Sequence, residues 1–388
     1  MTIAPSPWMN SEDVALIDFE RVVSQEMDLS EFPLASSVDK GVLIYDCAQL
    51  NFADPTSRRE IEAELSRALD AGPGVYVLKG AYPNTEVIDQ ATAAFMGILA
   101  SEREAGGPVG DHFGKAGANG RIWNAQQKLA LVAPEVFARY YTNQAIATAC
   151  HSWLGPNYQI TSQVNLVFPG GQAQEPHNDY HLGFQTNESS QRFPAHVHRF
   201  SPFLTLQGAV AHCDMPVESG PTMLLPHSQK YPLSYLAWRD QEIKDFFAQH
   251  MIQLPLSKGD ALFFNPALMH GAGTNHSANI ERMANLLQVS SAFGRAMETL
   301  DRKAMCVAVY PYLMQLQKAG TLTLEEVENS VAACAEGYPF PTNLDKDQPI
   351  GGLAPESQAD IMRSSLAQDL STEAFLQLLN EQALRTSA

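Results

Sequence analysis

The sequence has little that would support a disulfide-bonded, secreted or membrane-embedded protein. Only five cysteines occur among 388 residues, and none of them forms a CxxC pair. An odd number of scattered cysteines does not build a disulfide framework, which favours a reducing, cytoplasmic location. The N-terminal residues lack a basic segment followed by an apolar run, so we expect no secretion signal. No uncharged stretch of about 18 apolar residues occurs, which argues against a membrane span.

Basic residues are also scarce. The chain has 25 Lys and Arg against 43 Asp and Glu, which gives a formal net charge of −18. This balance repels phosphate backbones and anionic membrane surfaces, so neither nucleic acid nor a membrane is expected as a partner. It also disfavours a coenzyme A thioester, whose phosphates need a basic approach surface. A small-molecule substrate is the prediction, with the chain acting as a monomer or a homodimer.

Apolar periodicity predicts helices at both ends of the chain and strands between them. Helical patterns with capping residues occupy 54–72, 84–104 and 134–155, one more lies at about 238–249, and others follow residue 296. Short strands are predicted at 158–168, 203–213, 221–227, 260–265 and 283–293, separated by Pro/Gly-rich turns. Strands without regular intervening helices favour a sandwich or jelly roll over a doubly wound sheet.

We therefore predict an α+β protein with a mainly β core. The expected division is an N-terminal arm or cap over 1–55, a core domain over 56–295 and a helical extension over 296–388. The extension would pack on the core or at a dimer interface.

The stretch "EPHNDYHLGF" (175–184) places His177, Asp179 and His181 at alternate positions. In a strand, alternate side chains share a face, with successive members about 7 Å apart at roughly 3.3 Å per residue. His177 and Asp179 can converge on one ion, but a third ligand from the same straight strand would require a sharp bend. The site is more easily completed from another strand. His181 is then a pocket residue.

Five histidines downstream could complete such a site: His212, His227, His250, His270 and His276. His270 differs from the others because it lies between an apolar strand, "GDALFFNPALM", and a small-residue turn, "GAGTNHS", that leads to Arg282. An Arg beside a barrel interior that holds a dication is unfavourable unless an anion pairs with it. A carboxylate ligand would suit, because guanidinium binds carboxylate through a bidentate fork.

Two histidines and one carboxylate with open positions form the facial triad of non-haem Fe(II) oxygenases. The order His-x-Asp, His, Arg is similar to that of the Fe(II)/2-oxoglutarate dioxygenase superfamily, and within it the chain resembles the phytanoyl-CoA hydroxylase (PhyH) family. Three stretches carry the resemblance to the motifs of that family: "QEPHND" (174–179), "ESGPTMLLPHSQK" (218–230) and "GDALFFNPALMHGAGTNHSANIER" (259–282).

The resemblance implies a cupin-like double-stranded β-helix and a set of site residues. His177, Asp179 and His270 would be the catalytic iron ligands. Arg282 would pair with the distal carboxylate of 2-oxoglutarate, helped by a hydroxyl near Thr274, and Gln174 would contact its metal-bound end. The position two after His270, often Ser in the family, is Ala272, which leaves the polar helper open.

The implied reaction uses Fe(II), 2-oxoglutarate and O2, with ascorbate as a supporting reductant. It hydroxylates an unactivated C–H of a secondary metabolite or amino-acid derivative and releases succinate and CO2. Desaturation or cyclisation would need only another fate of the substrate radical. The presence of Asp179 disfavours halogenation, because related halogenases replace this carboxylate with Gly or Ala.

Substrate contacts are expected from variable segments around this motif. Asn165 and Gln163 lie on the preceding strand, and one of them is expected to face the interior. The polar insert 181–200 carries Arg192, which a solvated loop explains equally well. A second rim loop is predicted at 110–128, with Trp123 and Lys128 available.

Two other functions stay open at this point. One is a cupin-like metal-dependent isomerase or hydrolase that uses no 2-oxoglutarate and has no need for Arg282. The other is a barrel that binds a small ligand without turnover. Release of succinate separates the three.

Overall fold

The computed structural model describes residues 7–106 and 119–388. Its strands are β1 (Ser37–Asp39), β2 (Val42–Asp46), β3 (Val75–Lys79), β4 (Asn119–Ile122), β5 (Gln159–Val167), β6 (Thr205–Ala211), β7 (Met223–Leu224), β8 (Ala261–Phe264), β9 (His270–Gly271) and β10 (Arg282–Ser290). Its α-helices are α1 (Leu16–Val23), α2 (Pro55–Asp70), α3 (Glu86–Glu104), α4 (Ala125–Val132), α5 (Pro134–Tyr140), α6 (Gln144–Leu154), α7 (Asn187–Ser190), α8 (Ala195–Phe200), α9 (Ser234–Ala237), α10 (Gln241–His250), α11 (Arg302–Lys318), α12 (Leu324–Cys334), α13 (Gln358–Ala367) and α14 (Thr372–Thr386).

Two sheets form the core. The larger has the strand order β1-β2-β3-β8-β6-β10-β5-β4, and all its neighbouring pairs are antiparallel except β2 and β3. The smaller consists of β7 and β9 and continues through single bridges, among them His177 to His270. Apolar side chains from both sheets, such as Leu224, Leu262 and Val75, pack in one cluster between them. This arrangement confirms the predicted jelly-roll core.

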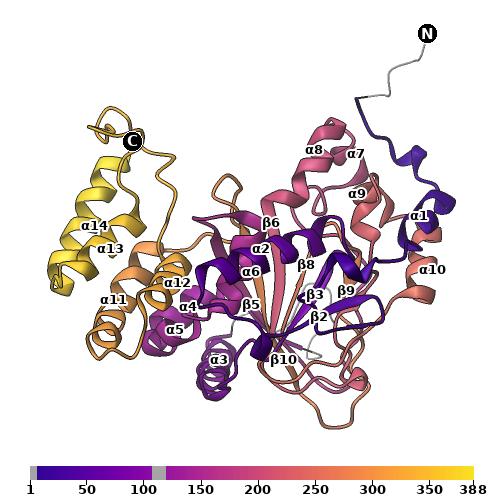
Figure 1. Cartoon of the computed structure of the whole chain (residues 1–388), viewed down its shortest axis with the longest axis horizontal. Coiled ribbons are helices and arrows are strands. Elements are labelled where there is room, and N and C mark those ends of the chain that lie inside the picture. The colour runs from indigo at the N-terminus through magenta and orange to yellow at the C-terminus, as the bar shows by residue number, and fades with distance from the viewer. Residues whose placement is uncertain (1–6, 107–118) are drawn as a thin grey trace.

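Helices cover the other face of the larger sheet. In Figure 1, α2 and α6 lie across the sheet, and α3, α4 and α5 lie towards its lower left edge. Their buried apolar side chains join those of β5 and β10 in the main hydrophobic cluster of the protein. The C-terminal helices continue this layer outward, because α11 packs on α4 and α5, and α13 and α14 pack on α11 (Figure 1). Helices therefore flank the β core from both ends of the chain, as predicted.

Two predicted helices are each divided into two. The pattern over 134–155 becomes α5 and α6, because the Asn143 side chain accepts a hydrogen bond from the Ile146 amide and begins a new helix. Of the helical patterns after residue 296, the one over 358–384 becomes α13 and α14, because Asp369 between them has a left-handed backbone with φ of 57°. The strand predicted over 221–227 is limited to β7.

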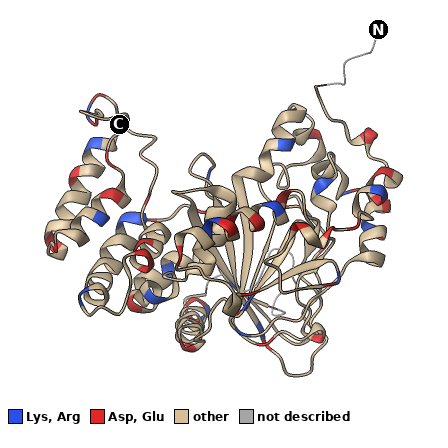
Figure 2. Ribbon diagram, in the orientation of Figure 1, with Lys and Arg blue, Asp and Glu red and all other residues tan. Residues whose placement is uncertain are grey.

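The N-terminal segment contributes to the body of the protein. Its strands β1 and β2 extend the larger sheet, and α1 packs near α10 beside the smaller sheet (Figure 1). The domain limits at residues 55 and 295 stay predictions. In the described part of the chain, no helix is both long and apolar enough to cross a bilayer. Figure 2 shows the charged residues mainly on helices and loops, whereas the central strands carry few.

A buried histidine, His212, lies where α3 and α5 cover the larger sheet. His212 accepts a hydrogen bond at Nε2 from the Tyr140 hydroxyl (3.0 Å) and donates from Nδ1 to Thr92 Oγ1 (2.9 Å), because the Thr92 hydroxyl itself donates to the Ile88 carbonyl. The neutral ring therefore has both nitrogens satisfied. Burial lowers the pKa of His212 to about 3.

This histidine is expected to make the fold sensitive to acid. Its folded pKa is lowered, so its contribution to the free energy of unfolding is complete above the unfolded value near 6.5. That contribution is lost at about 1.4 kcal/mol per pH unit as the pH falls from there towards 3. The free energy of unfolding, measured with urea, should therefore fall by about 2 kcal/mol less for His212→Gln than for wild type between pH 6.5 and 5. The exposed control His276→Gln should keep the wild-type slope. Equal slopes for His212→Gln and wild type would contradict the prediction.

Candidate active site

His177 and His270, far apart in the sequence, are neighbours in the smaller sheet. Their backbones exchange two hydrogen bonds, from His177 N to His270 O (2.8 Å) and from His270 N to His177 O (3.0 Å). The two imidazole rings face one side of this bridge with their centroids 4.6 Å apart. Backbone pairing alone thus brings these two side chains together.

Asp179 completes a cluster of three potential ligands. Its Oδ1 lies 3.6 Å from His177 Nε2, and its Oδ2 lies 3.5 Å from His270 Nε2. One ligand atom from each residue lies within 4.8 Å of the other two. In the described residues this is the one group of three or more His, Cys, Asp or Glu side chains with that geometry. The structure thus brings together the three predicted residues; their role as ligands stays a prediction.

The backbone fixes which imidazole nitrogen faces the cluster. His177 Nδ1 lies 2.7 Å from the Glu175 carbonyl, and His270 Nδ1 lies 2.9 Å from the Leu268 carbonyl. A carbonyl can only accept, so Nδ1 carries the proton in each ring, and the Nε2 lone pair points to Asp179. Metal-binding histidines are oriented in this way. The donor set therefore fits a divalent ion such as iron.

Asp179 is held as a carboxylate. Burial opposes its ionisation, but the positive charge of the two imidazoles in their protonated form and a hydrogen bond from Gln207 outweigh burial and hold the pKa of Asp179 well below its usual value. Gln207, in β6, donates that bond from Nε2 to Asp179 Oδ2. It was not among the residues predicted from the sequence. In the sequence, Gln207 is distinguished only as one amide side chain within a mainly apolar strand.

A cavity of about 150 Å³ opens beside the three residues, between the two sheets. Apolar side chains form part of its wall, including Met215, Leu256 and Phe264. Arg282, at the start of β10, also lines this cavity and is only 6% exposed. Burial lowers the pKa of Arg282 to about 10, so the side chain is still a cation at neutral pH.

The Arg282 guanidinium has no counter-charge among the described residues. Among residues 7–106 and 119–388, no carboxylate lies within ion-pair distance of it. A buried, unpaired charge is unfavourable, and an anion in the cavity would relieve it. The cavity therefore combines a set of metal donors with a cation suited to a carboxylate.

The phytanoyl-CoA dioxygenase (PhyH) family model matches residues 72–284, which begin just after α2 and end within β10. This range includes the three clustered residues and Arg282. The chain belongs to this family. The family consists of iron- and 2-oxoglutarate-dependent oxygenases, so the protein is an oxygenase-type enzyme. No curated protein matched the sequence.

Several solved structures are similar to this PhyH-family chain. The α-ketoglutarate-dependent epimerase SnoN from nogalamycin biosynthesis is 20% identical over 62% of this chain and 84% of its own, with a TM-score of 0.39. The carbocyclase SnoK from the same biosynthesis is 20% identical over 61% and 86%, with a TM-score of 0.42. HygX from Streptomyces hygroscopicus, solved with nickel, 2-oxoglutarate and hygromycin B, is 16% identical over 61% and 90%, with a TM-score of 0.44.

The two helper residues implied by the family motif lie in different surroundings. Gln174 lines the cavity, and its Oε1 accepts a hydrogen bond from the Ala272 amide (3.1 Å). Thr274 does not line the cavity, and its Oγ1 accepts a bond from the Ala173 amide (2.9 Å), which holds the loop. The role of Thr274 as the hydroxyl beside Arg282 stays a prediction.

The predicted substrate residues are also divided. Gln163 and Asn165 both line the cavity, rather than one of them, because residues two apart on β5 share a face. His181 is not part of the cavity wall, since left-handed backbones at Tyr180 and His181 end the extended segment after Asp179. Arg192 is exposed on the insert and lies outside the cavity.

The second predicted rim loop is only partly described. Its residues 110–118 lie outside the described residues. Beyond them, Trp123 lines the cavity with Arg121, whose guanidinium lies 4.8 Å from the Trp123 ring. Lys128 instead pairs with Glu102. Arg121 and Phe184 are further wall residues that the sequence did not single out.

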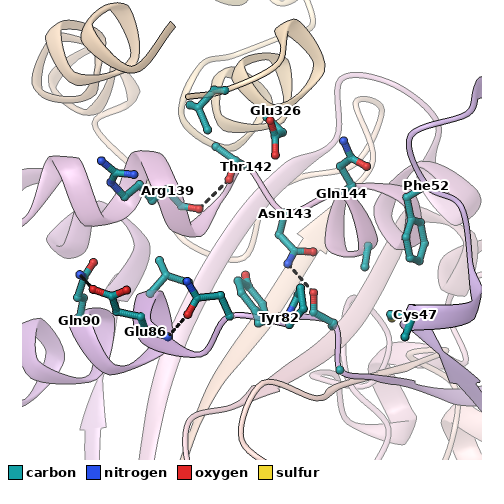
Figure 3. Close-up of a pocket in the computed structure, with 18 of the residues that line it drawn as sticks. Cys47, Phe52, Tyr82, Glu86, Gln90, Arg139, Thr142, Asn143, Gln144 and Glu326 are labelled. Atoms are coloured by element: carbon teal, nitrogen blue, oxygen red, sulfur yellow. Dashed lines mark hydrogen bonds between the residues drawn. The ribbon is translucent and has the colours of Figure 1, made fainter. Parts of the chain in front are cut away.

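A larger hollow of about 1140 Å³ lies elsewhere, between α3, α5, α6 and α12. It contains none of the three clustered residues. Figure 3 shows that its polar groups bond to one another: Asn143 Nδ2 donates to the Ala81 carbonyl (2.8 Å) and Thr142 Oγ1 donates to the Arg139 carbonyl (2.8 Å). This hollow has no arrangement suited to the family's chemistry.

Proposed function

We propose that the protein is an Fe(II)- and 2-oxoglutarate-dependent dioxygenase that hydroxylates an unactivated C–H of a small molecule. The observation that carries the proposal is a buried, unpaired Arg282 in the same cavity as the His177, Asp179 and His270 donors. One compound with two carboxylates, 2-oxoglutarate, can satisfy both features. An isomerase or hydrolase that uses no 2-oxoglutarate would have no need for this cation.

Each residue would have a separate task. His177, Asp179 and His270 would hold iron by one face and leave its other positions open. Arg282 would hold the far carboxylate of 2-oxoglutarate, and Gln174 would lie beside its metal-bound end. When bound, iron with 2-oxoglutarate and O2 supplies the oxidising chemistry, in which one oxygen atom enters succinate, CO2 leaves, and the other oxygen enters the product.

The cavity wall supplies positioning and exclusion of water. Met215, Leu256 and Phe264 belong to the apolar part of this wall, which offers water no hydrogen-bonding partner. The substrate would meet the polar part of the wall, which includes Gln163 and Asn165. A secondary metabolite or amino-acid derivative is the proposed substrate class, because the net charge of −18 does not suit the phosphates of a coenzyme A thioester.

The test is a screen of small molecules with Fe(II), 2-oxoglutarate and O2, in which succinate is measured and each product is weighed by mass spectrometry. We expect succinate release that depends on one substrate, whose mass rises by one oxygen atom. Loss of two hydrogens would identify a desaturase or cyclase instead. Product formed without 2-oxoglutarate would favour the isomerase or hydrolase. Binding of a small molecule without release of succinate would favour the barrel that binds a ligand without turnover.

A further inference from the structure

Gln207 is placed to act on the metal centre from the opposite sheet. It is buried in β6, where it pairs in register with Gln288 of β10 and Phe264 of β8. Its side chain crosses the cavity wall to reach Asp179, and its Nε2 donates to Asp179 Oδ2. Gln207, from the larger sheet, thereby holds the Asp179 side chain, which lies on the segment beside the smaller sheet.

The orientation of the Gln207 amide follows from chemistry. Asp179 is an ionised carboxylate, which can only accept hydrogen bonds, so the NH2 end of the amide must face it. The other end, Oε1, is buried and accepts no hydrogen bond from the described residues. The amide therefore has one arrangement, and exchange of its nitrogen and oxygen would place two acceptors against each other.

The orientation of the Asp179 carboxylate depends on a side-chain contact, whereas the orientation of the two imidazoles depends on the backbone. Both imidazoles are fixed by backbone carbonyls, and their strands are joined by the bridge between His177 and His270. When Nε2 carries no proton in either ring, Gln207 is the one described hydrogen-bond donor to the Asp179 side chain. Without Gln207, the carboxylate could rotate about χ2 and offer both oxygens to one ion.

We propose that Gln207 is a positioning residue that holds Asp179 as a one-oxygen ligand. By occupying Oδ2, the amide leaves Oδ1 for the ion and keeps the remaining coordination positions open for cosubstrate and O2. Because the amide is neutral, it does so without adding a charge beside the metal. This inference rests on the proposed role of His177, Asp179 and His270 as ligands. Outer partners of this kind typically contribute 10–100-fold to metal affinity.

The test is a titration of the full-length protein with Co(II), followed by its visible absorption. We expect Gln207→Leu to bind Co(II) about 10–100-fold more weakly than wild type, because the carboxylate is no longer held in place before the ion binds. The visible bands should also change in intensity, because their intensity depends on coordination number. Gln288→Leu is the matched control: it removes an equally buried amide from the same cavity wall, next to Gln207, without a bond to Asp179. It should keep the wild-type affinity within twofold.

Two further measurements keep the outcome decisive. Circular dichroism establishes that each variant is folded, and Gln207→Met, a flexible substitute of similar length, replaces Gln207→Leu if the latter does not fold. Wild-type affinity in a folded Gln207 variant, or an equal loss in Gln288→Leu, would overturn the inference. If wild type itself failed to bind Co(II), or if Asp179→Ala bound it equally well, the proposed metal centre would be at fault instead.

Discussion

Asp179→Ala is expected to abolish metal binding and succinate formation together. The variant removes the anionic donor of the cluster and leaves two neutral imidazoles, which hold a divalent ion much more weakly. The loss of affinity should exceed the roughly 10–100-fold that removal of an outer-shell partner produces. Titration with Co(II) measures the binding, and a succinate assay with Fe(II) and 2-oxoglutarate measures the turnover.

Glu175→Ala is the control for this variant. Glu175 is an exposed carboxylate close by in the same segment, and its side chain pairs with Lys244. Its backbone carbonyl, which orients His177, remains after the substitution. Wild-type affinity and turnover are therefore expected for Glu175→Ala. Retention of metal binding or turnover by Asp179→Ala would remove Asp179 from the ligand set.

Replacement of Arg282 should raise the KM for 2-oxoglutarate by about 10²–10³-fold. Truncation of one partner of a buried charge pair costs about 2–5 kcal/mol, because the other charge is left buried and unpaired. In Arg282→Met, the cosubstrate carboxylate would lie in a cavity without a cation. Metal affinity should stay within severalfold of wild type, because Arg282 is not a donor. Succinate formation at varied 2-oxoglutarate concentrations, with Co(II) titration beside it, measures both.

The same variant has a second, independent readout. A buried cation without a partner destabilises the protein when no anion is bound, so Arg282→Met should be no less stable than wild type without 2-oxoglutarate. Addition of 2-oxoglutarate to the metal-loaded proteins should raise the melting temperature of wild type only. Arg192→Ala, which removes the same charge from an exposed position, should leave the KM unchanged. An unchanged KM in Arg282→Met would show that Arg282 does not bind the cosubstrate.

The sequence predicted the core of the site because its features are local or ordered along the chain. The spacing of His177 and Asp179, the turn after His270 and the position of Arg282 are all visible in one dimension. The sequence also predicted that His181 does not join His177 and Asp179 on one ion, since a straight strand cannot bring a third side chain to it. The structural reason is different: the chain turns through left-handed backbones at Tyr180 and His181, which few non-glycine residues adopt.

Other features depend on strand register, which a single sequence does not provide. Gln207 contacts Asp179 only because β6 lies beside β10 and β8 in one alignment. Arg121 enters the wall because β4 pairs with the outer edge of β5. Thr274 was expected near Arg282 from its place in the motif; its Oγ1 accepts a hydrogen bond from the Ala173 amide, and its role towards Arg282 stays a prediction. The division of 134–155 into two helices depends on which of several polar residues acts as an N-cap.

The bridge between His177 and His270 links metal binding to folding. The ligands come from two segments distant in the chain, so an ion that binds all three closes a long loop and acts as a reversible cross-link. Binding to the folded chain alone raises the free energy of unfolding by about 2.7 kcal/mol when free metal is a hundredfold above its dissociation constant. Metal supply would thus set the lifetime of the folded enzyme as well as its activity.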